Sequence, residues 1–181
     1  IIDKNNLPDI AEYVEEYYNL RKHKGITKEQ AEGIMKNPLF YGAMMIRKGK
    51  ADTFVAGAIN TTANVCRAAI QIVGLKEGIN ILSSFFVMII PDKSFGKDGV
   101  LFYADSGVVI EPDEEQLADI AISTADSYKK ITGDKPMVAM LSFSTKGSAK
   151  HPLADKVINA TSIVKKKRPD ITIDGELQAD A

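Results

Sequence analysis

The sequence has 181 residues, of which 45% are hydrophobic and 26% are charged, as is typical of a folded globular protein rather than a disordered chain. A formal net charge of -1 argues against broad nucleic-acid binding, and a single cysteine excludes an internal disulfide or a cysteine-rich metal site. The two histidines, His23 and His151, are too far apart in sequence to suggest a histidine metal centre. No stretch approaches the roughly 20 apolar residues of a membrane-spanning helix. We therefore expect no metal, no nucleic acid and no membrane among the binding partners.

The first part of the chain is predicted to be rich in helices. Gly25 is a typical helix stop, Thr27 and Gln30 have the spacing of a capping box, and Pro38 suits a first helical turn. These signals predict helices over 8–24, 28–37 and 38–49, a short strand over 52–57, and a further helix that begins near residue 60.

Beyond residue 80 the pattern changes to strands that alternate with helices. The loop over 92–99 is too short for a helical crossover, so we expect the two strands beside it to pair antiparallel. The predicted strands cover 80–91, 100–107, 136–144 and 170–175, and the predicted helices cover 112–133 and 153–168. Helices alternating with strands predict an α/β protein. The change of character predicts two domains, 1–82 and 83–181.

A candidate anion site lies in the stretch "GAINTTANVCRAA", residues 57–69. Helix N-termini expose unpaired N–H groups that attract phosphates, and threonine hydroxyls add further donors. The side chains of Asn60, Asn64 and Arg67 share one helix face, and an arginine there leans back toward the helix start. An ordinary capped helix with a surface arginine explains the same residues, so both interpretations stay open.

Two other polar segments also allow two interpretations. The basic stretch "LRKHKG", residues 20–25, either complements a helix dipole or contacts a phosphorylated ligand through Arg21 or Lys24. The loop "SFSTKGSAKH", residues 142–151, joins a strand to a helix and is rich in hydroxyls and glycine, as an anion-binding loop would be. The loop lacks the Gly-Lys-Ser/Thr order that defines a P-loop.

Few residues are candidates for covalent or acid–base chemistry. Cys66 has no histidine nearby in sequence, so we expect a small buried apolar residue rather than a nucleophile. The carboxylates of Asp105, Asp155 and Asp174 could act as bases, although most such aspartates cap helices or form turns.

Taken together, these segments resemble the phosphate acetyltransferase (phosphotransacetylase) family. The matching stretches occur in family order across almost the whole chain, and include "LRKHKG", "YGAMMIRKGKAD", "VAGAINTTANVCRAAIQIVG", "ADSGVVIEPDEEQLADIAI", "VAMLSFSTKGSAKH" and "IDGELQADA". The resemblance implies a two-domain α/β fold of the isocitrate dehydrogenase-like type, with residues 1–82 in the latter part of the first domain and residues 83–181 in the front part of the second. It also implies a cleft between the domains, a cytoplasmic homodimer, and reversible acetyl transfer between acetyl phosphate and coenzyme A.

The resemblance further implies roles for individual residues. It places Arg21 and Arg67 at the substrate, and Thr61 and Thr62 in the acyl-phosphate pocket. The second-domain loop that faces the cleft corresponds to residues 144–148. Its expected substrate-binding residues are Ser144, Thr145, Gly147 and Ser148.

The family's catalytic serine–arginine pair and a nearby aspartate belong to an "SRG" segment that these 181 residues do not contain. We therefore expect both ends to be cut from a longer chain, and this segment alone to be inactive. Coenzyme A is expected as a substrate, with no permanently bound cofactor. Two alternatives remain open, namely a non-catalytic module that senses acetyl-CoA and an acyltransferase for longer acyl groups such as a phosphate butyryltransferase.

Overall fold

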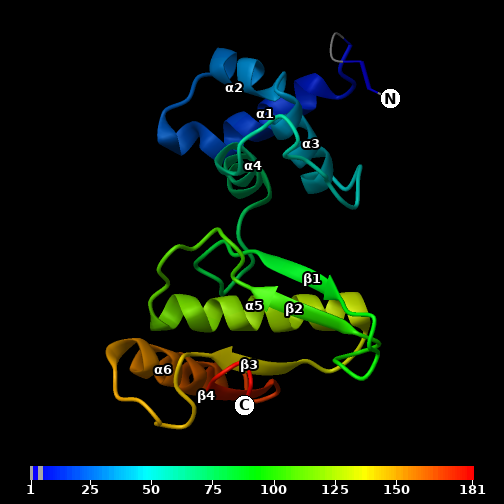
Figure 1. Cartoon of the computed structure of the whole chain (residues 1–181). Coiled ribbons are helices and arrows are strands. Elements are labelled where there is room, and N and C mark those ends of the chain that lie inside the picture. Colours follow the sequence, from blue (N-terminus) through cyan, green and yellow to red (C-terminus); the bar gives the residue numbers. More distant parts are fainter. Residues whose placement is uncertain (1, 4–5) are drawn as a thin grey trace. The chain divides into compact units, whose positions relative to one another are not determined.

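The computed structural model describes residues 2–3 and 6–181, and its contacts divide the chain into two compact units, Ile1–Lys76 and Glu77–Ala181 (Figure 1). The domain division expected from the sequence was after residue 82, so residues 77–82 belong to the second unit in the structure. The mixture of helices and strands agrees with the predicted α/β class.

The first unit is built from short helices packed around tyrosine and methionine side chains. Its buried cluster includes Tyr13 and Tyr17 of α1, Met35 of α2 and Met44 of α3. The helices of this unit are α1 (Ile10–Arg21), the 3₁₀ turn η1 (Lys22–Lys24), α2 (Lys28–Met35), α3 (Pro38–Arg47), α4 (Thr62–Ala68) and the π-helical turn η2 (Ala69–Val73).

Local capping signals explain where these helices begin. The Thr27 hydroxyl accepts a hydrogen bond from the Gln30 N–H, and the Gln30 side chain accepts one from the Thr27 N–H, so the predicted capping box is confirmed. The side chain of Asn37 caps α3, whose first residue is Pro38.

The predicted strand over 52–57 is wrong. Within the described part of the first unit no strand is present, so this segment has no partner for a hydrogen-bonded ladder. Its apolar residues instead make isolated contacts or face solvent. The ring of Phe54 lies against Gly42 of α3, where an added Cβ would be 2.5 Å from a ring carbon, and Val55 is 94% exposed.

The second unit begins with the expected antiparallel hairpin. Strand β1 (Phe85–Ile89) pairs with β2 (Val100–Ala104), and Phe85 lies opposite Ala104. The remaining elements alternate as predicted, and β3 pairs with β4 in parallel. They are α5 (Glu114–Thr132), β3 (Met137–Leu141), α6 (Pro152–Lys167) and β4 (Thr172–Leu177).

The core of the second unit lies between α5, α6 and the β3–β4 pair. Small residues allow close packing there, since Ala118 and Ala160 have no exposed surface. Gly175 of β4 lies so close to β3 that an added Cβ would be 2.5 Å from the Met140 Cβ. Across the described residues, no helix is both long and apolar enough to cross a membrane.

Candidate functional site

The predicted anion site begins at the cap of α4. The Thr61 hydroxyl accepts a hydrogen bond from the Asn64 N–H at 3.3 Å, which makes Thr61 the N-cap, and Thr62 is the first helical residue. Both threonines are exposed. The helix therefore starts two residues later than the sequence pattern suggested, and its first turn presents two hydroxyl groups to solvent.

Arg67 leans toward this first turn. Its Nη1 donates to the Asn64 Oδ1 at 2.8 Å, one turn back along α4, and the residue is exposed. Asn64 thus connects the two parts of the predicted motif, because its backbone N–H bonds Thr61 and its side chain bonds Arg67. A guanidinium has five N–H donors, so this contact orients the side chain and leaves donors for an anion.

Arg21 lies near the same helical segment. The Tyr17 hydroxyl donates to the Gln71 Oε1 at 2.7 Å, which ties α1 to η2. Burial raises the pKa of Tyr17, and the nearby positive charge of Arg21 partly offsets that rise. Gln71 follows Arg67 by four residues, in the π-helical turn η2 that continues α4. The structure therefore places the two predicted arginines along neighbouring helices of the first unit.

The loop between β3 and α6 surrounds an internal carboxylate. Glu176 of β4 is 2% exposed, and its Oε1 accepts from the Gly147 N–H at 2.6 Å and from the Ser144 hydroxyl at 3.1 Å. The Lys146 N–H donates to the Glu176 carbonyl at 3.2 Å. Ser144 is fully buried. The donors of Ser144 and Gly147, which the sequence suggested for a bound anion, are thus used by this chain's own carboxylate.

Further contacts hold the rest of the loop. The Thr145 N–H donates to the Ser148 hydroxyl at 3.0 Å, and the Thr145 hydroxyl accepts from the Gln178 N–H at 2.8 Å. Ser148 is exposed and Thr145 is half-buried. Of the four predicted loop residues, these two remain able to contact a ligand, and their role stays a prediction.

Sequence reasoning missed Glu176. The hydrogen bond from the Gly147 N–H lowers the pKa of the Glu176 carboxyl group, and burial opposes that shift. The hydrogen bond from the Ser144 hydroxyl lowers the pKa further. The carboxylate is therefore ionised at neutral pH and acts as an anchor for the loop. The only available signal was an acidic residue directly after the predicted strand over 170–175, where a buried charge would need partners.

Two of the three aspartates that the sequence suggests as bases, Asp105 and Asp174, have structural partners. Asp105 accepts hydrogen bonds from the N–H and hydroxyl of Ser84 and from the N–H groups of Val108 and Val109. Burial would raise the pKa of Asp105, but these hydrogen bonds lower it overall. Asp174 forms an ion pair with Lys146. Neither carboxylate is poised as a base at neutral pH.

The remaining predicted groups are accounted for locally. His151 caps α6, because its Nδ1 accepts from the Leu153 N–H at 3.1 Å, and Cys66 is half-buried in α4. No cluster of three or more histidine, cysteine or acidic residues suited to a metal is found in the part of the chain that the structure describes. The arrangement can bind an anion through Arg67 and the α4 hydroxyls.

Comparisons with known proteins agree with the resemblance. The family model described as phosphate acetyl/butaryl transferase matches residues 1–181. The chain is 50% identical over 181 residues to a phosphate acetyltransferase of Acetivibrio thermocellus and 47% identical to one of Clostridium acetobutylicum, and in both cases all of this chain aligns with 54% of the relative.

Solved structures give the same result. A phosphotransacetylase from Streptococcus pyogenes superposes with a TM-score of 0.87 at 39% identity, covering 100% of this chain and 53% of the other. A phosphotransacetylase from Staphylococcus aureus superposes with a TM-score of 0.82 at 37% identity, covering 94% of this chain and 51% of the other. The chain thus spans about half the length of the relatives that it matches.

Proposed function

Since the chain belongs to the phosphate acetyl/butaryl transferase family, we propose that the full-length protein containing it transfers an acetyl group reversibly between acetyl phosphate and coenzyme A. The observation that carries this proposal is the 50% identity, along all 181 residues, to a protein named phosphate acetyltransferase. The orientation of Arg67 beside exposed hydroxyls on α4 supports it, because acetyl phosphate and coenzyme A both carry phosphoryl groups.

Arg67, Thr61 and Thr62 are the proposed contacts of the acyl-phosphate group. The planar guanidinium of Arg67 suits two phosphoryl oxygens at once, and Asn64 holds it toward the first turn of α4. Positive charge there stabilises the phosphate as it leaves. We assign Arg21 to a phosphate of coenzyme A or to the rim of the site.

The reaction is a direct acyl transfer. A base removes the proton from the coenzyme A thiol, the thiolate sulfur forms a bond to the acetyl carbon, and the bond from that carbon to the phosphate oxygen breaks. Inorganic phosphate leaves with the electron pair of the broken bond. The residues of this chain bind and orient the substrates, and the base is expected in the family's serine–arginine segment, which these residues do not contain.

The loop over 144–148 is proposed to face the substrate through Thr145 and Ser148. Ser144 and Gly147, whose donors are used by Glu176, instead set the conformation of the loop. No metal or permanently bound cofactor is part of this scheme. We expect the enzyme to be a cytoplasmic homodimer, and light scattering of the full-length protein measures its oligomeric state.

Variants of Arg67 in the full-length protein test the site. Arg67→Ala is expected to lower kcat/KM for acetyl-CoA formation at least about tenfold, equivalent to roughly 1.4 kcal/mol of transition-state stabilisation. Arg67→Lys keeps the charge but loses the fork-shaped donor. Its kcat/KM should therefore lie between the value of the unchanged protein and that of Arg67→Ala. Lys166→Ala, at an exposed position of α6, is the control and should leave the kinetics unchanged. Unchanged kinetics in Arg67→Ala would remove Arg67 from the mechanism.

Acyl specificity is the second question, because the family description covers both acetyl and butyryl transfer. Rates with acetyl, propionyl and butyryl phosphate distinguish the two activities, and we expect acetyl phosphate to give the highest kcat/KM. A full-length protein that binds acetyl-CoA but turns over none of the three would instead be a sensing module.

A further inference from the structure

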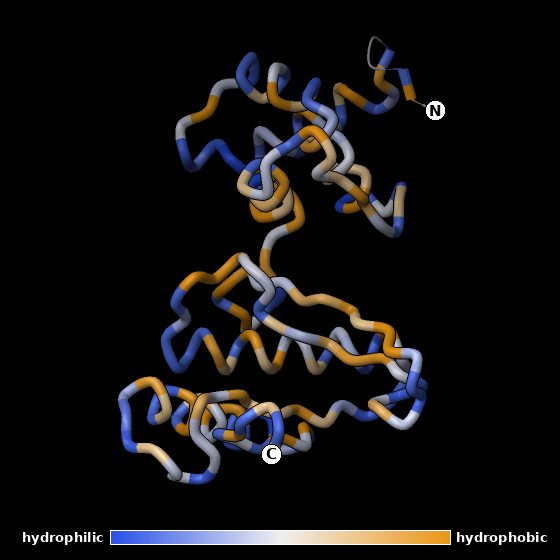
Figure 2. Tube along the Cα trace, in the orientation of Figure 1, coloured by the Kyte–Doolittle hydropathy of each residue, from blue (hydrophilic) through white to orange (hydrophobic). Residues whose placement is uncertain are grey.

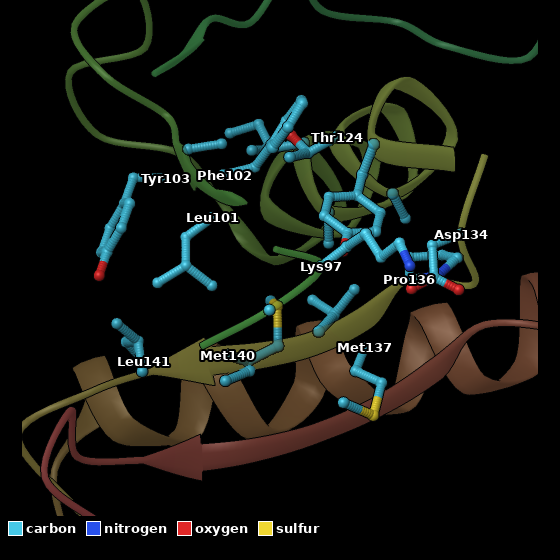
Figure 3. Close-up of a pocket in the computed structure, with 18 of the residues that line it drawn as sticks. Lys97, Leu101, Phe102, Tyr103, Thr124, Asp134, Pro136, Met137, Met140 and Leu141 are labelled. Carbon is cyan, nitrogen blue, oxygen red and sulfur yellow. The ribbon is translucent and has the colours of Figure 1, made fainter. Parts of the chain in front are cut away.

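The loop that joins β3 to α6, residues 142–151, uses its inner hydrogen-bond donors on a carboxylate of its own chain. Figure 2 shows this loop mostly in pale and blue colours, and Figure 3 shows Leu141, the last residue of β3, after which the loop begins. We propose that the loop presents hydroxyl oxygens as acceptors, set by Glu176 as a positioning residue, and binds a neutral amide N–H of the pantetheine arm of coenzyme A rather than a phosphoryl group. This inference rests on the proposed function and names the part of the substrate that the loop contacts.

Glu176 is a buried negative charge whose partners are donors of the loop. Its Oε1 accepts from the Gly147 N–H at 2.6 Å and from the Ser144 hydroxyl at 3.1 Å. Among the residues that the structure describes, no basic side chain forms an ion pair with this carboxylate, and Lys146 of the same loop pairs with Asp174 instead. A phosphoryl group bound at this loop would be repelled by that charge, whereas a neutral donor would not.

The carboxylate fixes the direction of the neighbouring hydrogen bonds. An ionised carboxylate only accepts, so the single hydroxyl proton of Ser144 points to Glu176. The Ala149 carbonyl is neutral and farther from the Ser144 hydroxyl, at 3.5 Å, and the Ala149 N–H donates to the Ser144 oxygen at 3.1 Å. The Ser148 Oγ lies 3.3 Å from the Ser144 Oγ. Because the proton of Ser144 is already used, Ser148 is the donor in this contact, and its own proton points into the loop.

The two hydroxyls that remain accessible can offer lone pairs to a ligand. The Ser148 Oγ accepts from the Thr145 N–H at 3.0 Å and donates to Ser144, so one of its two lone pairs has no partner within the described residues. The Thr145 Oγ1 accepts from the Gln178 N–H at 2.8 Å and donates to the Gln178 Oε1 at 3.3 Å, which also leaves one lone pair. Ser148 is exposed and Thr145 is half-buried. Both oxygens are therefore acceptors toward a ligand, and the protons of both are used inside the chain.

Coenzyme A carries the kind of donor that this arrangement accepts. Its pantetheine arm has neutral amide N–H groups on the side of the thiol, and the adenine amino group is the other neutral N–H donor. Its ionised phosphates are acceptors only, and acetyl phosphate has no N–H group at all. The loop is thus expected to contribute to the binding of coenzyme A and not to the binding of acetyl phosphate.

Ser148→Ala in the full-length protein tests which substrate the loop binds. Loss of one neutral hydrogen bond should raise the KM for coenzyme A about fivefold and leave kcat and the KM for acetyl phosphate unchanged. Ser162→Ala, at an exposed position of α6, is the matched control and should change none of these constants. A higher KM for acetyl phosphate in Ser148→Ala, or an unchanged KM for coenzyme A, would overturn the proposal.

Pantetheine as the acetyl acceptor separates the arm from the nucleotide. It has the thiol and the amides of coenzyme A but no phosphate and no adenine. The kcat/KM of the unchanged protein should exceed that of Ser148→Ala about fivefold with pantetheine, as it does with coenzyme A. A ratio near one with pantetheine would assign the contact to a phosphate or to adenine, and no reaction with pantetheine would show that the arm alone is not recognised. Either result contradicts the proposal, whereas a full-length protein that is inactive with coenzyme A contradicts the proposed function itself.

Two variants of Glu176 test its role as a positioning residue. Glu176→Met has a similar shape but no acceptor, so the Ser144 proton can turn to the Ser148 oxygen and occupy its lone pair. The KM for coenzyme A should rise about fivefold, and Ser148→Ala should add nothing further in the double variant. Glu176→Gln keeps an oxygen that accepts from Ser144 and Gly147, so its KM should rise less than that of Glu176→Met.

The combination of these variants distinguishes positioning from a merely structural role. Effects of Glu176→Met and Ser148→Ala that multiply, or an unchanged KM for coenzyme A in a folded Glu176→Met protein, would show that Glu176 does not act through Ser148. Thermal unfolding identifies a Glu176→Met protein that does not fold. In that case the ratio measured with pantetheine decides whether the loop binds the arm.

Discussion

The hydrogen bond between Tyr17 and Gln71 offers a direct test of how α1 supports the helix that carries Arg67. Tyr17 is 2% exposed, and its hydroxyl donates to the Gln71 Oε1 at 2.7 Å. In Tyr17→Phe this bond is lost while the buried ring remains. A typical internal hydrogen bond contributes about 1 kcal/mol, and an acceptor left without its donor adds a further cost. Gln71 is only half-buried, so water can partly replace the donor. We therefore expect a loss of about 1.5 kcal/mol in the free energy of unfolding.

The neighbouring tyrosine is a matched control. Tyr18 is half-buried, with the Lys28 Nζ 5.4 Å from its ring centroid. Tyr18→Phe keeps that ring and should change the free energy of unfolding by less than about 0.5 kcal/mol. Urea unfolding followed by the methyl NMR signals of Met35 and Met44 reports on the first unit, whose core contains both methionines.

A double variant separates the hydrogen bond from other effects of the substitution. Replacing both partners, as in Tyr17→Phe with Gln71→Met, removes the unpaired acceptor and should recover at least half of the lost stability. Equal effects of Tyr17→Phe and Tyr18→Phe, or no recovery in the double variant, would refute the reasoning.

Three further predictions concern pH and packing. Burial raises the pKa values of Tyr13, Tyr17 and Tyr41 above the ordinary value of about 10. The stability that these phenols contribute is thus complete below about pH 10 and is lost as the pH rises through their folded values; urea unfolding across that range should show the loss, and a flat profile would contradict it. The Gly147 N–H bond holds the pKa of Glu176 below its usual value of about 4.3, so order in the loop is expected above that pH and is lost as the pH falls through the lower folded value. The NMR shift of the Gly147 amide measures this, and a midpoint at or above about 4.3 would oppose the assignment. Val164→Ala, at a position with no exposed surface in α6, should cost about 2 kcal/mol in urea unfolding. Ser162→Ala, exposed on the same helix, should cost less than about 0.5 kcal/mol, and equal costs would show that Val164 is not a core residue.

Local chemistry made much of the fold predictable. The capping box of Thr27 and Gln30 and the hairpin of β1 and β2 depend on residues close together in sequence, and both are confirmed. The helix that carries Arg67 was also expected, and it starts within two residues of the predicted position.

Long-range contacts explain what the sequence could not show. The stretch over 52–57 has the composition of a strand, but a strand also needs a partner, and the described part of the first unit provides none. Glu176 lies 29 residues beyond Gly147 and 32 beyond Ser144. No periodicity in the sequence indicates that the Glu176 carboxylate fills the loop over 142–151, whose composition suggests an anion site.

In the candidate site, too, the local contacts could be predicted from the sequence and the long-range contacts could not. The contact between Arg67 and Asn64 follows from helical spacing and was therefore predictable. The connection of Arg21 to this helix runs through Tyr17 and Gln71, which are 54 residues apart, and only the structure shows it.

Acetyl transfer by the full-length protein is the most direct test of the proposed function. The purified protein is incubated with acetyl phosphate and coenzyme A, and acetyl-CoA and inorganic phosphate are measured together. We expect the two products in equal amounts, with the 181-residue chain inactive under the same conditions. A folded full-length protein that forms no thioester from acetyl, propionyl or butyryl phosphate would contradict the proposed function.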